Sequence, residues 1–253
     1  MTQGDPFIDL IDGWRYRFLA GEFAFVGEGA AASLVTLQRL LCDATARLNR
    51  WGGWSKDPVP VARHTLLVCA FTLARAEGLG WPEEQIDATV REAAAHELHE
   101  PLGLGDVLSP VLRWLRETCP EPVDGLIALG ERAVRRLFDI MPQDDRAADA
   151  RREIARIVKL ADHDAAAVER GYACNDAPAW LGPRVALARH AIGQHSMSDG
   201  VLGLRLWKVL TGGAAAMHKE TDTGFVQDWL LRRLGFGTPE SRARLVELTG
   251  VPS

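Results

Sequence analysis

The chain of 253 residues has no apolar run approaching the roughly 18 to 20 residues that a membrane span needs, so no membrane segment is expected. Its N-terminus has no basic segment followed by an apolar stretch, so a secretory signal peptide is not expected either. The four cysteines are widely spaced and form no Cys-x-x-Cys pair. Cys42 and Cys69 fall within apolar helical runs, which predicts buried free thiols and a reducing, cytoplasmic location.

Several common signatures of nucleotide-handling and hydrolytic enzymes are also missing. The chain has no Gly-x-x-x-x-Gly-Lys loop, no Gly-x-Gly-x-x-Gly fingerprint and no Gly-x-Ser-x-Gly elbow, which disfavours P-loop, Rossmann and α/β-hydrolase enzymes. A net charge of −5 leaves no basic footprint for a nucleic acid. A small anionic substrate remains compatible, because a pocket can be locally positive in an acidic protein.

Helical patterns dominate, and the period-2 alternation of half-buried strands is almost absent. We therefore predict an all-α fold with few strands. A linker candidate at 174–183 divides a helical core over 1–180, which carries the site, from a C-terminal helical extension over 181–253 packed on the core. The predicted helices cover about 6–20, 31–50, 60–78, 82–100, 107–118, 122–140, 142–173, 183–192, 199–218, 222–234 and 238–248.

Two histidines and two carboxylates stand out within these segments: His64, His96, Glu97 and Asp162. A single His on an apolar helix is usually a satisfied core residue, but three helices that each offer such groups can converge on one divalent cation. Mixed nitrogen and oxygen ligands suit Mn, Co, Fe, Ni, Zn or Mg. Such a cation can activate a water at neutral pH, so the pattern predicts a metal-dependent hydrolase.

The order His, His-carboxylate, Asp on a helical frame resembles the signature of the HD-domain phosphohydrolases. The resemblance is greatest to the 5′-deoxynucleotidase-like branch and to phage and prophage HD hydrolases, and it covers roughly residues 34–175. It implies an HD-domain helical bundle with extra C-terminal helices. The matching segments are Leu48-Asn49-Arg50-Trp51-Gly52-Gly53-Trp54, Pro60-Val61-Ala62-Arg63-His64-Thr65-Leu66, His96-Glu97-Leu98-His99-Glu100, Gly105-Asp106, Ser109-Pro110, and Ala161-Asp162 with Glu169.

This chain departs from the family pattern in three places. The family's His-Asp dyad is His96-Glu97 here, and Glu reaches one methylene further than Asp. The run from Glu100 to Asp106 carries one more residue than is usual, and Trp54 stands where phage relatives often have a His. A degenerate HD fold that has lost its metal is therefore the alternative to a working centre.

The resemblance implies catalytic roles for Glu100, in proton transfer beside the attacking water, and for Asp106, which would orient that water or protonate the leaving oxygen. The alternatives are a solvated carboxylate at a helix end for Glu100 and an N-cap for the helix from Val107 onward for Asp106.

The resemblance likewise implies that Arg50 contacts the substrate phosphate and that Trp51 shapes the nucleoside pocket. Trp54 and Lys159 are implied as further substrate contacts. Guanidinium suits bidentate phosphate binding. The alternatives are a basic residue at a helix C-terminus for Arg50, a loop anchor for Trp54 and a solvated side chain for Lys159.

We therefore expect a phosphohydrolase that binds one divalent metal and acts on a small nucleotide. A deoxynucleoside 5′-monophosphate is the preferred substrate. A deoxynucleoside triphosphate triphosphohydrolase on the same site is the nearest alternative. A non-catalytic nucleotide-binding or scaffold protein is the alternative of another class, and the motifs of alarmone hydrolases are not found. Related folds often form homodimers, although the sequence itself shows no interface.

Overall fold

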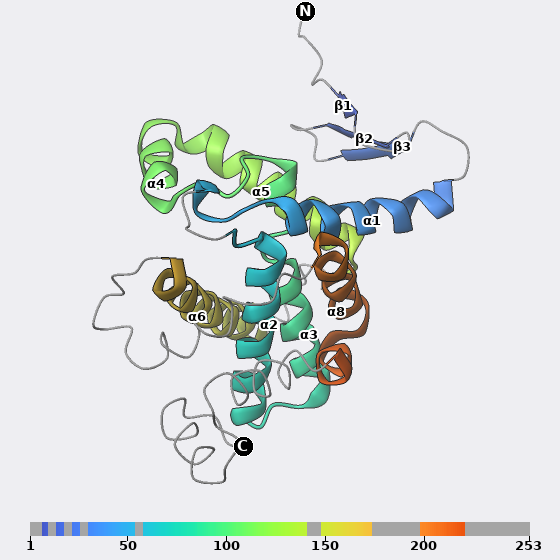
Figure 1. Cartoon of the computed structure of the whole chain (residues 1–253), viewed down its shortest axis with the longest axis vertical. Coiled ribbons are helices and arrows are strands. Elements are labelled where there is room, and N and C mark those ends of the chain that lie inside the picture. Colours follow the sequence, from blue (N-terminus) through green and yellow to red (C-terminus); the bar gives the residue numbers. More distant parts are fainter. Residues whose placement is uncertain are drawn as a thin grey trace, which may run out of the picture.

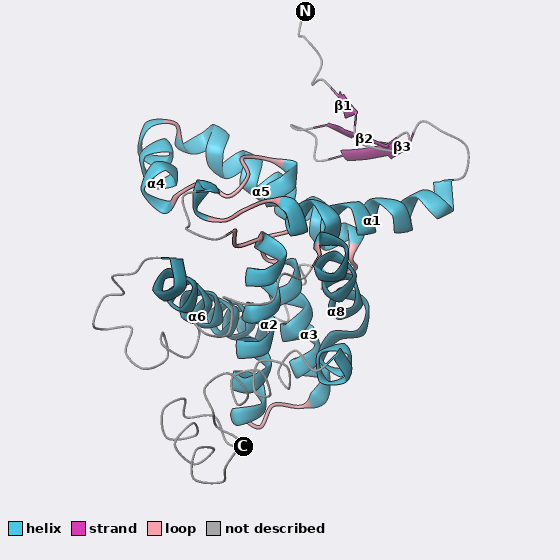
Figure 2. Ribbon diagram, in the orientation of Figure 1, coloured by secondary structure: helices cyan, strands magenta, loops and turns pink. Residues whose placement is uncertain are grey.

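The computed structural model describes residues 7–9, 14–17, 22–25, 30–53, 58–140, 148–173 and 198–220. Within these residues the predicted all-α fold is confirmed, with one small sheet at the N-terminal end (Figure 2). The helices are α1 (Ala30–Arg47), α2 (Val61–Gly78), α3 (Glu83–Ala95), α4 (Ser109–Thr118), α5 (Pro120–Leu137), α6 (Ala148–Ala173) and α8 (Asp199–Glu220), with short 3-10 turns η1 (Trp51–Gly53) and η2 (Glu100–Leu102).

Helix α2 lies at the centre of the bundle and contacts α1, α3, α6 and α8 (Figure 1). Its sequence is apolar on nearly every side, and Val61, Val68, Cys69 and Leu73 are all fully buried. A helix that is hydrophobic all round must be enclosed by other elements, which explains its place among four neighbours. The polar His64 on this helix therefore faces the interior of the protein.

The segments on either side of η1 are held together by backbone hydrogen bonds. Arg50 N donates to Val59 O at 2.8 Å, and Val61 N donates to Leu48 O at 2.8 Å. Asn49 and Pro60 form an isolated antiparallel bridge between these bonds. The chain leaving α1 is thus tied to the start of α2, and Arg50 is brought beside the first turn of the helix that carries His64.

Helix α8 packs against α1, α2 and α3 and belongs to the same hydrophobic cluster as they do. Leu202, Leu206 and Leu210 are almost fully buried on its inner side. The helix is broken at Gly213, whose φ of 54° and ψ of −140° are non-helical. Beyond the break, Ala214 N donates a hydrogen bond of 2.9 Å to Asp87 Oδ1 on α3. This carboxylate occupies the position of a helix cap and satisfies a backbone donor that the break leaves free.

The helix predicted over 6–20 is wrong in its described part. Three antiparallel strands, β1 (Phe7–Asp9), β2 (Trp14–Arg17) and β3 (Glu22–Phe25), form a small sheet in the order β1-β2-β3. Trp14 pairs with Phe25 in its register. Trp14 and Tyr16 are buried whereas Arg15 between them is exposed. This alternation over two residues is typical of a strand with one face on the core.

The end of the third helix also differs from its prediction. Helix α3 ends at Ala95 rather than near Glu100, and its last turn gives way to tighter i to i+3 bonds, from Leu98 N to Ala95 O and from Glu100 N to Glu97 O. Glu100 therefore lies in η2, beyond the end of α3, and does not share a helix face with His96. His96 and Glu97 instead project from the turn that follows α3.

The predictions for the remaining segments have mixed outcomes. Cys42 and Cys69 are buried, as expected, and neither forms a disulfide within the described part of the chain. Within the described ranges, no helix is both long enough and apolar enough to span a bilayer. The linker candidate at 174–183 and the helices predicted over 183–192, 222–234 and 238–248 lie outside the described residues, and the division at residue 180 stays a prediction.

Candidate metal centre

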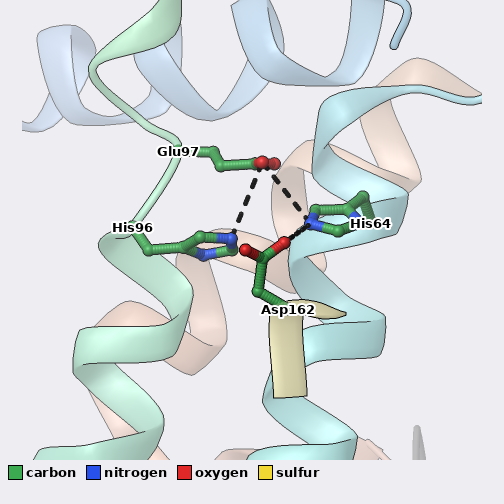
Figure 3. Close-up of side chains that lie close together, drawn as sticks. All are labelled: His64, His96, Glu97 and Asp162. Atoms are coloured by element: carbon green, nitrogen blue, oxygen red, sulfur yellow. Dashed lines mark ion pairs between the residues drawn. The ribbon is translucent and has the colours of Figure 1, made fainter. Parts of the chain in front are cut away.

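Four side chains from three parts of the fold meet in the interior (Figure 3). His64 comes from α2, His96 and Glu97 from the turn after α3, and Asp162 from α6. Each offers one ligand atom, and these four atoms all lie within 4.8 Å of one another. The predicted set of metal ligands is thus brought together, although the residues are far apart in the sequence.

The imidazole of His64 is completely buried and held from behind. Its Nδ1 lies 2.6 Å from Glu169 Oε1, whereas its Nε2 lies 3.3 Å from Asp162 Oδ1 and 3.4 Å from Glu97 Oε1. Since an ionised carboxylate can only accept, Nδ1 carries a hydrogen and donates it to Glu169. Nε2 is left pointing at the two other carboxylates of the cluster.

His96 is oriented in the same way by the backbone. Its Nδ1 lies 2.6 Å from the carbonyl oxygen of Ala93, which can only accept, so Nδ1 is the donor. Its Nε2 is buried, lies 3.7 Å from Glu97 Oε1 and has no hydrogen-bond partner among the described residues. The rings of His64 and His96 are 5.6 Å apart between centroids. Both imidazoles therefore turn Nε2 toward the same small volume.

Burial and neighbouring charges set the protonation of this cluster. Burial acts to lower the pKa of His64, but Glu169 and Glu97 outweigh it and raise that pKa to about 10. Burial lowers the pKa of His96 below its usual value. Burial acts to raise the pKa values of Glu97 and Asp162, but interactions with His64 and other cationic partners hold both below their ordinary values. Without metal, His64 is thus the cation between ionised carboxylates, and a bound metal would take the place of its Nε2 proton.

These residues fit a divalent metal ion. Two neutral imidazole nitrogens and two carboxylates form the mixed donor set that Mn, Fe, Co, Ni and Zn accept. The buried Nε2 atoms of His64 and His96 have no hydrogen-bond partner among the described residues, whereas both Nδ1 atoms have acceptors. Metal-binding histidines are usually held by such a bond from the ring nitrogen that does not bind the metal.

Arg50 lies in this network rather than on the surface. It is 8% exposed, its Nη1 donates a hydrogen bond to Glu97 Oε1, and its Nε lies 3.0 Å from Glu169 Oε2. Its guanidinium carbon is also 5.4 Å from the centroid of the Trp51 ring. The alternative of a basic residue on the last carbonyls of a helix is not what the structure shows, since Arg50 pairs with two buried carboxylates.

Glu169 had no role assigned from the sequence. It stands two helical turns after Asp162 on α6, its side chain is completely buried, and it contacts both His64 and Arg50. The spacing of seven residues, which places two side chains on one face of a helix, was the available signal.

Asp106 lies beside the turn that carries Arg50. Its carboxylate accepts hydrogen bonds from the backbone of Trp51 and Gly52, and burial raises its pKa above the usual value. Trp51 and Gly52 have φ angles of 62° and 57°, so this carboxylate stabilises a turn in the left-handed region. The N-cap alternative for Asp106 is wrong, because Leu108 occupies the N-cap of α4.

Glu100, in η2, is partly buried, and its Oε2 is buried without a hydrogen-bond partner among the described residues. It is therefore not the solvated carboxylate of the alternative interpretation. Burial, reinforced by Glu97 and Asp106, raises the pKa of Glu100 to about 9. The group is thus a neutral carboxylic acid at pH 7. Together with His99 it lines a small pocket of about 70 Å³ between η2 and the helices α4 and α5.

Lys159 stands at the solvent side of the cluster. Its side chain is 67% exposed, and its Nζ lies 2.9 Å from Asp162 Oδ2, one turn further along α6. The ammonium group is thus both solvated and in contact with a candidate ligand. Trp54, the remaining predicted substrate contact, lies outside the described residues.

No family model matches the sequence, and the curated proteins contain no significant match.

Proposed function

We propose that this protein is an HD-type, metal-dependent phosphohydrolase of nucleotides, with a deoxynucleoside 5′-monophosphate as its substrate. The observation that carries the proposal is the convergence of His64, His96, Glu97 and Asp162 to within 4.8 Å. These residues come from α2, from the turn after α3 and from α6, and the fold brings them together from distant parts of the sequence.

In this proposal the two Nε2 atoms and the carboxylates of Glu97 and Asp162 hold one divalent cation. Such a cation supplies a Lewis acid that withdraws charge from a phosphoryl oxygen and lowers the pKa of a water bound to it. The protein contributes a buried setting, in which charges are screened less than in water. It also contributes ligands whose orientation is fixed by Glu169 and by Ala93 O.

Glu100 is the group suited to move a proton. In the metal-free protein its pKa of about 9 keeps a hydrogen on the carboxyl at neutral pH, and its Oε2 has no hydrogen-bond partner among the described residues. A neutral acid near the reacting phosphate can give this hydrogen to the leaving oxygen of the nucleoside, and the carboxylate can afterwards accept one from water. Asp106 supports the Arg50 turn next to it, which suits a positioning role.

The charges around the cluster favour a monophosphate. Arg50 already pairs with Glu97 and Glu169, so its charge is largely neutralised. Lys159 is exposed beside Asp162, and it is the cation that we assign to the phosphate. A triphosphate brings more negative charge toward the ionised carboxylates of Glu97 and Asp162 than a monophosphate does. Since like charges repel most strongly where water is excluded, the smaller charge is the better match.

The test is release of phosphate, pyrophosphate or triphosphate from a panel of dNMPs, NMPs and dNTPs with Mn, Co, Mg, Ni or Zn. We expect metal-dependent phosphate release from dNMPs that disappears in His96→Ala. His163→Ala is the matched control, because His163 is an exposed residue next to Asp162 on α6. Triphosphate release would support the triphosphohydrolase instead. Nucleotide binding without release under any metal would contradict the enzyme and favour the non-catalytic alternative.

A further inference from the structure

A closed chain of contacts runs behind the candidate metal ligands. His64 Nδ1 lies 2.6 Å from Glu169 Oε1, and the other oxygen of Glu169 lies 3.0 Å from Arg50 Nε. Arg50 Nη1 then donates to Glu97 Oε1, which in turn lies 3.4 Å from His64 Nε2. These contacts link α2, α6, the segment before η1 and the turn after α3. Two of the residues involved, Glu169 and Arg50, are not themselves candidate ligands.

The burial of Glu169 makes its contacts obligatory. Its side chain is completely buried, and a buried carboxylate is costly unless it is paired and hydrogen-bonded. Both oxygens meet a cationic or donor group of this chain: one meets the imidazole of His64, and the other meets the guanidinium of Arg50. Glu169 accepts the hydrogen bond from His64 Nδ1. The His64 ring therefore cannot flip, or adopt the tautomer with its hydrogen on Nε2, without losing this bond.

Arg50 performs the corresponding task for Glu97. The side chain of Glu97 follows the end of α3, where no helix backbone restrains it, and it is one methylene longer than an Asp. A guanidinium presents several donors in a fixed plane, so one Arg can hold two carboxylates in a defined relation. Arg50 holds Glu97 on one side and Glu169 on the other, and a Lys, with a single ammonium group, offers no such fixed plane.

We propose that Glu169 and Arg50 are positioning residues of the metal centre: Glu169 fixes the His64 imidazole with Nε2 toward the ligand cluster, and Arg50 fixes the Glu97 carboxylate. This assigns Arg50 to the support of a ligand rather than to the substrate phosphate. The proposal rests on the metal-binding part of the proposed function and is independent of which phosphate bond is cut.

The experiment measures Zn²⁺ affinity by isothermal titration, with thermal denaturation of the metal-free proteins alongside. The variants are Glu169→Gln, which keeps the shape but removes the charge, and Arg50→Lys, which keeps the charge but removes the planar fork. Glu92→Gln is the matched control, because Glu92 on α3 forms a partly buried ion pair with Arg135 and is neither a candidate ligand nor a partner of Glu169 or Arg50. We expect Kd for Zn²⁺ to rise about 10- to 100-fold in the first two variants and to stay unchanged in the control.

The experiment gives a different result if Glu169 and Arg50 only stabilise the fold. If Glu169→Gln and Arg50→Lys melt at lower temperature but bind Zn²⁺ as tightly as the wild type, the positioning role is overturned while the metal centre stands. If the wild type binds no Zn²⁺ or other divalent metal, the metal centre fails and this proposal fails with it.

A measurement on the wild type covers the case in which the variants do not fold. Nitrogen-15 NMR of histidine in the Zn²⁺-loaded protein should show a protonated Nδ1 on His64. A His64 ring protonated on Nε2 would contradict the proposal.

Discussion

Replacing Glu97 with Asp would recreate the His-Asp dyad of the HD-domain family, yet the structure predicts that it harms this protein. Glu97 Oε1 accepts a hydrogen bond from Arg50 and lies 3.4 Å from His64 Nε2 and 3.7 Å from His96 Nε2. The Asp side chain is shorter by one carbon–carbon bond, or roughly 1.5 Å. Its carboxylate would therefore withdraw from Arg50 and from the point where the two imidazoles meet.

The expected loss of stability follows from the hydrogen bond between Arg50 and Glu97 that the substitution breaks. Glu97 is 9% exposed, so its hydrogen bond to a charged Arg50 is a buried one. Hydrogen bonds to charged groups contribute about 1.5–3 kcal/mol, and that is the expected fall in the free energy of unfolding of the metal-free protein. The shorter carboxylate also moves away from the metal position, and a further loss of that size in the metal-bound state alone raises Kd for the metal about 10- to 150-fold, since about 1.4 kcal/mol is a factor of ten.

The assay is metal titration by calorimetry together with urea denaturation of the metal-free protein. Glu92→Asp is the control, since it makes the same change in a Glu–Arg pair outside the cluster and should leave the metal affinity unaltered. Tighter or equal metal binding by Glu97→Asp would refute the reasoning. It would mean that the Glu97 carboxylate does not depend on Arg50 or on its own length for its position.

Three further results are expected. Gly213→Ala should lower the free energy of unfolding, measured by urea denaturation, by about 1–3 kcal/mol, because φ at this position is 54° and a Cβ would lie 2.9 Å from Asp87 Oδ1. Gly200→Ala is the control and should have no such effect, because no atom lies within 4 Å of its added Cβ. Burial raises the pKa of Glu100 from 4.5 to about 9, so in the metal-free protein its contribution to stability is present below pH 4.5 and is lost as the pH rises toward 9. Melting temperatures of Glu100→Gln against pH should lack this decline, and an unchanged decline would show that another group causes it. Finally, a metal at 100 times its Kd should stabilise the folded state by about 2.7 kcal/mol, and a chelator should abolish the gain in melting temperature.

The candidate ligands could be predicted because their chemistry is local. His64 and Asp162 are polar groups inside apolar helical runs, and His96 and Glu97 stand next to each other where such a run ends. Residue type and order were therefore enough to select them. The helix bounds around them followed from hydrophobic spacing and from Gly and Pro breaks, and α2 and α8 were found almost to the residue.

The support of these ligands was not predictable in the same way. Glu169 lies 105 residues from His64, and Arg50 lies 47 residues from Glu97. No local pattern says which of many acidic and basic residues will meet in a core. The phosphate-binding role of Arg50 was implied by the family resemblance, and only the folded structure brings this residue between Glu97 and Glu169.

Two of the predicted helices differ from the structure, for different reasons. The alternation Trp14-Arg15-Tyr16-Arg17 is a strand signal, in which two buried aromatics alternate with an exposed and a partly exposed arginine. It competes with the preceding Asp5-Pro6, a pair that is typical of a helix start. The end of α3 at Ala95 has no such signal, because no Gly or Pro stands there. The tighter i to i+3 bonds that follow it are a feature of the folded structure, in which His96 and Glu97 belong to the buried cluster.

The most direct test of the central claim is the metal content of the purified protein after equilibrium dialysis against Mn²⁺ or Zn²⁺. One bound metal per chain is predicted for the wild type, and none for His64→Ala or for Asp162→Ala. His163→Ala, the exposed neighbour, should keep the full content. Equal metal content in the wild type, His64→Ala and Asp162→Ala would contradict the account, because the cluster would then not be where the metal binds.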